Sequence, residues 1–323
     1  MKIIYKLLFL FLLTIGYSSC DFLDIVPDEI TTEADAFKDR NAAKNFVYSC
    51  YGYLPQSNVA SGSLDLLTGD EVITAFEHET FASFPKGNYT ASSPVISYWN
   101  TFFQGLRQCY IFLENVDKVP DLTESVKTDY IAQVKFLIAY YHYQLARCYG
   151  PIILIKELPD VNASQAEYLP RTSYDECVDW ICNLLDEAAS SLPAIRTNKE
   201  DYGLATSVGA KAVKAKMLLY AASPLFNGNS SFYSNFTDKS GSQLMPLTYD
   251  PNKWVKAKTA IKEAIDLAEQ NGHALYVKQD YKIGNEDANP YPAAGPVRCL
   301  RTSLVDWDSR NPEVLLAETR SEG

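Results

Sequence analysis

Histidine is scarce in this chain: its 323 residues include three, His78, His142 and His273, which lie far apart in the sequence. Catalytic and metal-binding histidines act with partner groups at defined spacings, and none of the three has such a companion nearby. His78 and Glu79 begin like the zinc motif H-E-x-x-H, but Ala82 stands in place of the second histidine. His142 lies in a tyrosine-rich stretch, which favours a packed, hydrogen-bonded side chain. The sequence therefore predicts no metal site.

Motifs of the common enzyme classes are missing as well. There is no G-x-S-x-G nucleophile elbow, no P-loop and no Rossmann glycine pattern. Asp70 and Glu71 are adjacent carboxylates, but neighbouring side chains diverge, whereas acid–base catalysis needs two groups that face one substrate. We therefore expect a protein that is not an enzyme and uses no cofactor. A hydrolase whose distant carboxylates meet in the fold is the alternative that stays open.

Runs of basic residues are also missing. The chain has 29 Lys and Arg against 40 Asp and Glu, a net charge of −11. Because no stripe of basic side chains is available to follow a phosphate backbone, we expect no nucleic-acid partner. The acidic balance equally argues against charge-driven binding to anionic lipid.

Cysteine pairs with metal-binding spacing do not occur among the seven cysteines. There is no C-x-x-C, and Cys177 and Cys182 are five positions apart, which suits no common zinc site. Cys109, Cys148 and Cys182 lie in apolar helical patterns, where a free cysteine behaves as a small hydrophobic residue. We therefore expect structural core cysteines after Cys20, with one or two disulfides as the alternative.

The N-terminus has the layout of a bacterial lipoprotein signal. A start with two lysines precedes an apolar run at residues 7–15, which is shorter than the roughly 20 residues that a spanning helix needs. Small residues and then Cys20 follow, so we predict that Cys20 is acylated and becomes the first mature residue. Tyr17 stands where such motifs usually have leucine. Cleavage as an ordinary secreted protein is the alternative.

After a signal peptide at 1–19 and a lipidated tether at 20–40, we expect one helical domain over 41–323. Apolar residues at helical spacing predict helices at 41–53, 97–118, 123–148, 173–192, 206–222 and 251–271. Ser173 and Glu176 have the spacing of a capping box at the start of one of them. The second to fifth helices form two pairs, and the last has no obvious mate. This pattern, with alanines facing bulky residues, predicts a mainly α, tetratricopeptide-like solenoid.

Two short apolar runs, 152–155 and 314–317, predict strands. The second lies six residues before Gly323, and an apolar strand with nothing after it to pair with is unusual in a finished domain. We therefore expect a chain that is truncated at its C-terminal end.

Three long segments, 55–94, 224–249 and 276–312, read as loops rich in Gly, Ser, Asn, Pro and aromatic residues, and loops of this length are usually functional or disordered. Their rings include Tyr89, Phe226, Phe232, Tyr233, Tyr249, Tyr281, Tyr291 and Trp307. A flat ring covers the apolar C–H face of a sugar, while carboxylates and amides bond its hydroxyls. As a set, the loops therefore favour a binding surface. The alternative is that the rings only fix the loops onto the helices.

Four loop residues are the candidate ligand contacts. Trp307 has Asp306, Asp308 and Arg310 close by, so that its ring is accompanied by polar groups. Tyr291 offers a second stacking surface. Asp70 and Glu71 offer carboxylates that accept hydrogen bonds from the hydroxyl groups of a sugar. We therefore predict ligand contacts from Asp70, Glu71, Tyr291 and Trp307.

Several motifs together resemble the SusD/RagB family of Bacteroidetes outer-membrane lipoproteins. They are C-D-F-L-D at 20–24, Y-W at 98–99, V-K-F-L-I-A-Y-Y-H-Y-Q-L-A-R-C-Y-G-P-I-I-L at 134–154, P-R-T-S-Y-D-E at 170–176, A-A-S-P-L-F-N at 221–227 and N-P-E-V-L at 311–315. These motifs follow the family order and cover nearly the whole chain. Ile138 departs from the family by replacing the arginine usual in that helix.

The resemblance implies a cell-surface lipoprotein that binds oligosaccharides and sits as a lid on a SusC-like TonB-dependent transporter of the outer membrane. Its fold would be a tetratricopeptide-like scaffold with a loop-built binding face. Asp21 and Asp24 resemble the surface-export signal of these bacteria. Family members are usually much longer, which agrees with a truncated chain. Capture of peptides or other nutrients by the same type of lid is one alternative, and a helical interaction scaffold without a small ligand is another.

Overall fold

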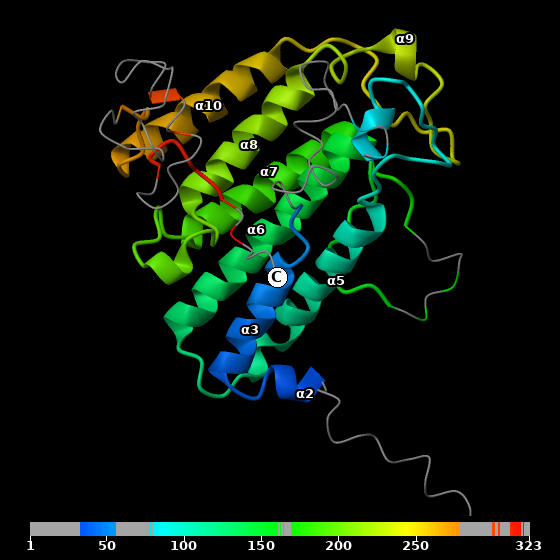
Figure 1. Ribbon diagram of the computed structural model, residues 1–323. Coiled ribbons are helices and arrows are strands. Elements are labelled where there is room, and N and C mark those ends of the chain that lie inside the picture. Colours follow the sequence, from blue (N-terminus) through cyan, green and yellow to red (C-terminus); the bar gives the residue numbers. More distant parts are fainter. Residues whose placement is uncertain are drawn as a thin grey trace, which may run out of the picture.

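The structure is a computed structural model that describes residues 33–55, 76, 78, 80–160, 162, 164, 169–277, 299–300, 303, 311–317 and 319. Within these ranges almost all regular structure is helical (Figure 1). The longer helices are α3 (Arg40–Tyr51), α5 (Trp99–Asn115), α6 (Glu124–Tyr149), α7 (Tyr174–Ser191), α8 (Ser207–Ala222) and α10 (Asn252–Gln270). The short ones are α2 (Glu33–Ala36), α9 (Ser230–Tyr233), η2 (Thr80–Ser83), η3 (Val116–Lys118) and η5 (Lys199–Asp201). The predicted helices are therefore confirmed within a few residues, whereas the predicted signal peptide and most of the tether lie outside the described residues.

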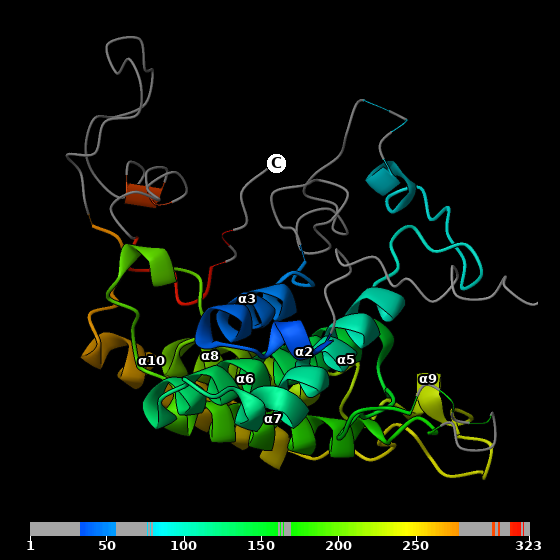
Figure 2. The same ribbon diagram turned by 90° about the horizontal axis from the view of Figure 1, so that it is seen from below.

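The long helices pack in chain order as one row. α5 contacts α6, α6 contacts α7, α7 contacts α8, and α8 contacts α10, while α3 lies against both α5 and α6 (Figures 1 and 2). This arrangement confirms the mainly α fold of paired helices. The expectation that the last helix lacks a mate is wrong, because α10 packs closely on α8. Ala215 of α8 meets Ala260 and Ala264 of α10, so small side chains on both helices let them approach.

Helix α6 is the centre of the core. Its buried residues lie all around the helix rather than on one stripe, because α3, α5 and α7 cover different sides of it. Gly105 of α5 allows the close contact there, since a Cβ at that position would lie 2.9 Å from Tyr53 Cβ and 3.0 Å from Tyr141 Cε2. Tyr141 in turn donates a hydrogen bond of 2.5 Å to the carbonyl of Cys50. The ring of Tyr141 is therefore fixed between α3, α5 and α6.

Four of the six described cysteines are core residues, as the sequence predicts. Cys50, Cys109, Cys177 and Cys182 are free thiols and are buried, whereas Cys148 and Cys299 are only partly buried. Burial raises the pKa of Cys177 to about 11 and that of Cys182 to about 12. Both thiols are therefore protonated at neutral pH and act as core side chains.

The two predicted strands do not form. Residues 152–155 run without a neighbouring strand, and their backbone bonds to single groups: the Ile152 carbonyl accepts from Thr172 N at 2.7 Å. Residues 314–317 are also outside any strand, and Val314 N closes a turn onto the Asn311 carbonyl at 3.1 Å. A short apolar run can be buried in a loop as well as in a strand. Ile152 and Leu154 are buried without a sheet, whereas residues 314–317 are only partly buried.

The predicted capping box is also corrected. Helix α7 begins where expected, but the Ser173 side chain makes no cap hydrogen bond. The preceding helix, α6, is ended by Gly150, whose φ of +69° lies in the left-handed region that glycine adopts without strain.

No helix in the described part of the chain is both long enough and apolar enough to cross a membrane.

Candidate ligand-binding site

The four predicted ligand contacts, Asp70, Glu71, Tyr291 and Trp307, lie outside the described residues, as does the predicted acylation site Cys20. They stay predictions. Two hollows lined by described residues lie at opposite ends of α8, one rich in aromatic side chains and one mixed in character.

The first hollow, called here the aromatic cleft, has a volume of about 530 Å³. It lies where α5 begins and where α6 and α8 end, beside the cyan segment that precedes α5 in Figure 1. Its lining residues are Phe84, Tyr89, Thr90, Ala91, Pro94, Val95, Ile96, Tyr98, Arg147, Cys148, Tyr149 and Tyr220. Five of these twelve carry aromatic rings, and a cleft of several hundred cubic ångströms with a few polar groups is the usual form of a small-ligand site.

The floor of the aromatic cleft is held rigidly by hydrogen bonds and ring contacts. The hydroxyl of Tyr149 accepts from Tyr98 N at 2.9 Å, which joins the end of α6 to the start of α5. Trp99 meets Tyr149 edge-on at 5.2 Å between centroids, and Arg171 lies over the Trp99 ring at 5.4 Å. Arg171 also donates to the Pro151 carbonyl at 2.8 Å, past the end of α6. The rings are therefore in place before a ligand arrives.

The rim of the aromatic cleft is more open. Tyr89 is 52% exposed, and its ring meets Phe84 edge-on at 5.5 Å. Thr90 and Ser93 exchange two backbone hydrogen bonds of 3.1 Å, which fold the segment into a tight turn. The Tyr89 ring is thus open to solvent and also lines the cleft. A cleft lined by an exposed ring and by fixed rings suits a ligand with one apolar face and several polar groups.

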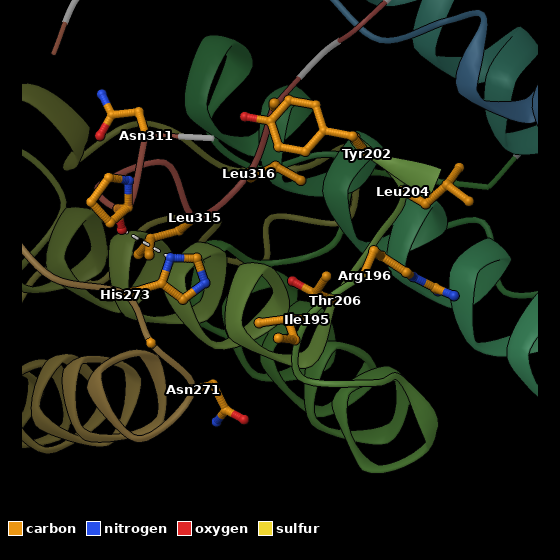
Figure 3. Close-up of a pocket in the computed structure, with 14 residues that line it drawn as sticks. Ile195, Arg196, Tyr202, Leu204, Thr206, Asn271, His273, Asn311, Leu315 and Leu316 are labelled. Carbon is orange, nitrogen blue, oxygen red and sulfur yellow. Dashed lines mark hydrogen bonds between the residues drawn. The ribbon is translucent and has the colours of Figure 1, made fainter. Parts of the chain in front are cut away.

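The second hollow, of about 250 Å³, lies between the ends of α7 and α10 and the start of α8 (Figure 3). Its polar groups are largely engaged with the protein itself. His273 Nδ1 lies 3.0 Å from the Pro312 carbonyl, the bond drawn in Figure 3. The Arg196 side chain extends away from His273, and its guanidinium group bonds both carboxylate oxygens of Asp129 at 2.8 and 3.0 Å. The aromatic cleft is therefore the better candidate.

His142, for which the sequence favours a packed, hydrogen-bonded role, is a core residue. Its ring is fully buried and meets Trp180 edge-on at 4.8 Å. Nε2 accepts from Ile155 N at 3.1 Å, so Nδ1 carries the proton and donates to the Ile138 carbonyl at 2.8 Å. This confirms the packed, hydrogen-bonded role that the sequence favours. The described residues contain no group of His, Cys, Asp or Glu side chains arranged to hold a metal ion.

The sequence reading found only part of the cleft. Tyr89 is one of the loop rings expected to form a binding surface, but Tyr98 and Tyr220 lie in predicted helices, and Tyr149 directly follows one. Their places at helix ends are the one signal that separates them from the core. A ring in the first or last turn of a helix borders the loops, where ligands bind.

Comparison with known proteins gives consistent matches. Residues 21–219, more than half of the chain, match the SusD-like family model described as "Starch-binding associating with outer membrane". The solved structure of BT4246 is 36% identical, with a TM-score of 0.69 over 75% of this chain and 42% of that one. A SusD-like protein of Bacteroides fragilis, BF3747, is 26% identical with a TM-score of 0.50, over 60% of this chain and 37% of that one.

A curated relative agrees with these structures. The SusD-like protein P25 of Formosa agariphila is 23% identical over 230 residues, which are 67% of this chain and 43% of that protein. The chain thus spans less than half the length of each of these three relatives.

Proposed function

Because this chain belongs to the SusD/RagB family, we propose that it is a non-catalytic binding protein that captures oligosaccharides at the cell surface. The captured glycan would pass to a SusC-like TonB-dependent transporter in the outer membrane. The observation that carries the proposal is the aromatic cleft, which is lined by the exposed Tyr89 ring together with tyrosine rings from the helix ends. The family description as starch-binding supports the choice of a carbohydrate.

The chemistry of the cleft fits a sugar. The C–H face of a pyranose ring stacks on Tyr89 or Tyr98, while tyrosine hydroxyls and the Arg147 guanidinium group bond its hydroxyl groups. Because most of the floor is held by internal contacts, little conformational entropy is lost on binding. Asp70, Glu71, Tyr291 and Trp307 are proposed as further contacts on the same loop-built face.

We predict that Tyr89→Ala weakens binding of an oligosaccharide about 5- to 150-fold, because loss of one stacking ring costs roughly 1–3 kcal/mol by analogy with bases stacked on aromatics. Calorimetric titration measures the change, after a glycan array run beside a peptide pool has identified a ligand. Trp307→Ala, titrated in the same way, is expected to show a loss of the same size.

Tyr48→Ala is the matched control, since Tyr48 of α3 is 38% exposed, does not line the cleft and is not one of the loop rings. Its affinity should equal that of the unchanged protein. If Tyr89→Ala also binds with unchanged affinity, the cleft is not the site. If the array shows binding of peptides and no glycan, carbohydrate capture itself is wrong, and turnover of a bound glycan would contradict the non-catalytic role.

We also propose that a lipid anchor on Cys20 holds the protein at the membrane. In cells that process lipoproteins, mass spectrometry of the mature N-terminal peptide should show Cys20 as the first residue, carrying acyl chains. Cys20→Ala should remove both the acyl mass and the membrane association. An unacylated mature N-terminus in the unchanged protein would favour the ordinary secreted form.

A further inference from the structure

Two core cysteines from different helices, Cys50 of α3 and Cys109 of α5, meet inside the protein. Neither side chain has any exposed surface. The two thiols contact each other, since Cys50 is a side-chain hydrogen-bond partner of Cys109. Both are free thiols in the structure, which is therefore the reduced form of a pair that is already in contact.

The contacts around this pair define how α3 and α5 lie against each other (Figures 1 and 2). The Gln108 side chain donates to the Ser49 hydroxyl at 3.2 Å, and these two residues directly precede the two cysteines. About one turn before Ser49 and one turn after Gln108, the ring centroids of Phe46 and Phe112 are 6.2 Å apart. Contacts that go backward along one helix and forward along the other indicate an antiparallel pair. In this register the two cysteines face each other.

The two helices are also close enough for a covalent link to be considered. A disulfide needs Cα atoms about 4.4–6.8 Å apart, whereas the axes of packed helices are usually about 8–10 Å apart. Gly105, one turn before Cys109, lets α5 approach closely, because a Cβ there would lie 2.9 Å from the Cβ of Tyr53. The close approach is therefore within one helical turn of the cysteine pair.

The predicted signal peptide implies that the chain is exported. Exported bacterial proteins fold in an oxidising compartment, where disulfides form and persist. From the register, the burial and the contact of the two thiols, we infer that Cys50 and Cys109 form a disulfide bond in the exported protein. This inference goes beyond the proposed binding function and does not depend on it.

The step is a thiol–disulfide exchange with an exported oxidant, either a disulfide oxidoreductase or a small-molecule disulfide. The two cysteine thiols give up two electrons and two protons as the new S–S bond forms. The S–S bond of the oxidant breaks, and its two sulfur atoms take up the electrons and protons as two thiols.

The surroundings of the pair determine when this exchange can take place. Burial raises the pKa of the Cys109 thiol, and the contact with Cys50 raises it further. A protonated thiol is a poor nucleophile, and a side chain without exposed surface is out of reach of an oxidant. The bond is therefore expected to form while the chain folds, and to resist reductants until the chain unfolds.

Peptide mapping of the exported protein tests the inference directly. The chain is produced with its own signal peptide, unfolded in urea with an alkylating agent and no reductant, digested, and analysed by mass spectrometry. We expect one cross-linked peptide pair that joins Cys50 to Cys109, while Cys177 and Cys182 are alkylated. The folded protein should keep the link in dithiothreitol, and it should lose the link when urea is added.

The thermal midpoint Tm measures what the bond contributes. Protein that is reduced in urea and refolded with reductant should melt about 5–15 °C below the oxidised protein, because the bond closes a loop of about 60 residues. The double variant Cys50→Ala with Cys109→Ala should melt near the reduced form, whether or not reductant is present. Cys182→Ala is the matched control, because it also removes a buried thiol but should keep the difference between oxidised and reduced protein.

Alkylation of both Cys50 and Cys109 in the exported protein would overturn the inference, and so would a link from either of them to another cysteine. If the alanine variants do not fold, the peptide map still decides, since it needs no substitution. A correct link whose reduction leaves the Tm unchanged would show that the bond does not stabilise the fold.

Discussion

Arg196→Ala is expected to lower the free energy of unfolding by about 3 kcal/mol, because it leaves the carboxylate of Asp129 largely buried without its partner. The side chains are only 12% and 26% exposed, respectively. This loss is at the low end of the range for breaking a buried ion pair, since Asp129 keeps some contact with water. Chemical denaturation followed by far-ultraviolet circular dichroism measures the loss.

The pair is part of a closed polar network that joins three regions of the fold. Arg196 Nη1 and Nη2 donate to Asp129 at 3.0 and 2.8 Å, and its Nε and Nη2 donate to the Ala205 carbonyl at 3.1 and 2.9 Å. Gln133 donates to Asp129 at 2.7 Å and accepts from the Tyr51 hydroxyl at 3.0 Å. Tyr51 accepts from Ala205 N at 2.9 Å, which closes the ring. Removing one member therefore leaves several buried groups with fewer hydrogen bonds.

Lys135→Ala is the matched control. Lys135 of α6 and Glu187 of α7 form a separate ion pair at 3.0 Å, with side chains that are 36% and 60% exposed. An exposed pair contributes less than about 1 kcal/mol, so this variant should be nearly as stable as the unchanged protein. The double variant Asp129→Ala with Arg196→Ala should lose less than the sum of the two single variants. A loss for Arg196→Ala no larger than that for Lys135→Ala would contradict the role of the network.

A second large effect is expected on the free energy of unfolding at acidic pH. Burial lowers the pKa of His142 from 6.5 to about 4, against a smaller opposing contribution of the hydrogen bond to Ile138. The unfolded chain therefore takes up a proton on this residue near pH 6.5, and the folded chain only near pH 4. Between these values the unfolded state binds more protons, so stability falls as the pH is lowered. The full change is about 3 kcal/mol, since each pKa unit corresponds to 1.36 kcal/mol.

His142→Gln should remove the part of the acid-induced loss of stability that comes from protonation of His142. Glutamine keeps an amide that can bond the Ile138 carbonyl or Ile155 N, but it does not titrate. We expect the variant to be less stable at pH 7, while its stability decreases by about 3 kcal/mol less than that of the unchanged protein between pH 7 and pH 4. Urea unfolding at intervals across this range gives both curves.

His78→Gln is the control for the pH series, because His78 is exposed. Its stability should follow the pH curve of the unchanged protein. If His142→Gln also follows that curve, a different group causes the acid sensitivity. Both variants are first compared with the unchanged protein at pH 7, so that a general loss of structure is not mistaken for an effect of pH.

The helices and several buried residues could be predicted from the sequence because their signals are local. Apolar residues at a spacing of three and four positions mark the buried sides of α5 and α7, and burial follows directly from that spacing. The packing of His142 and of the cysteines followed from the same patterns, since a polar or small residue inside an apolar helix has to be satisfied within the core.

The tertiary structure alone decided which segments meet. The mate of α10, the absence of strands at 152–155 and 314–317, and the pairing of Arg196 with Asp129 all depend on contacts between segments far apart in the chain. The aromatic cleft is the clearest case, since Tyr89, Tyr149 and Tyr220 come from three distant segments. Local periodicity tells which face of a helix is buried, but it carries no information on which surface covers that face. Because packing chooses the partner by shape and polar complementarity over the whole fold, the cleft appears only once the helices are assembled.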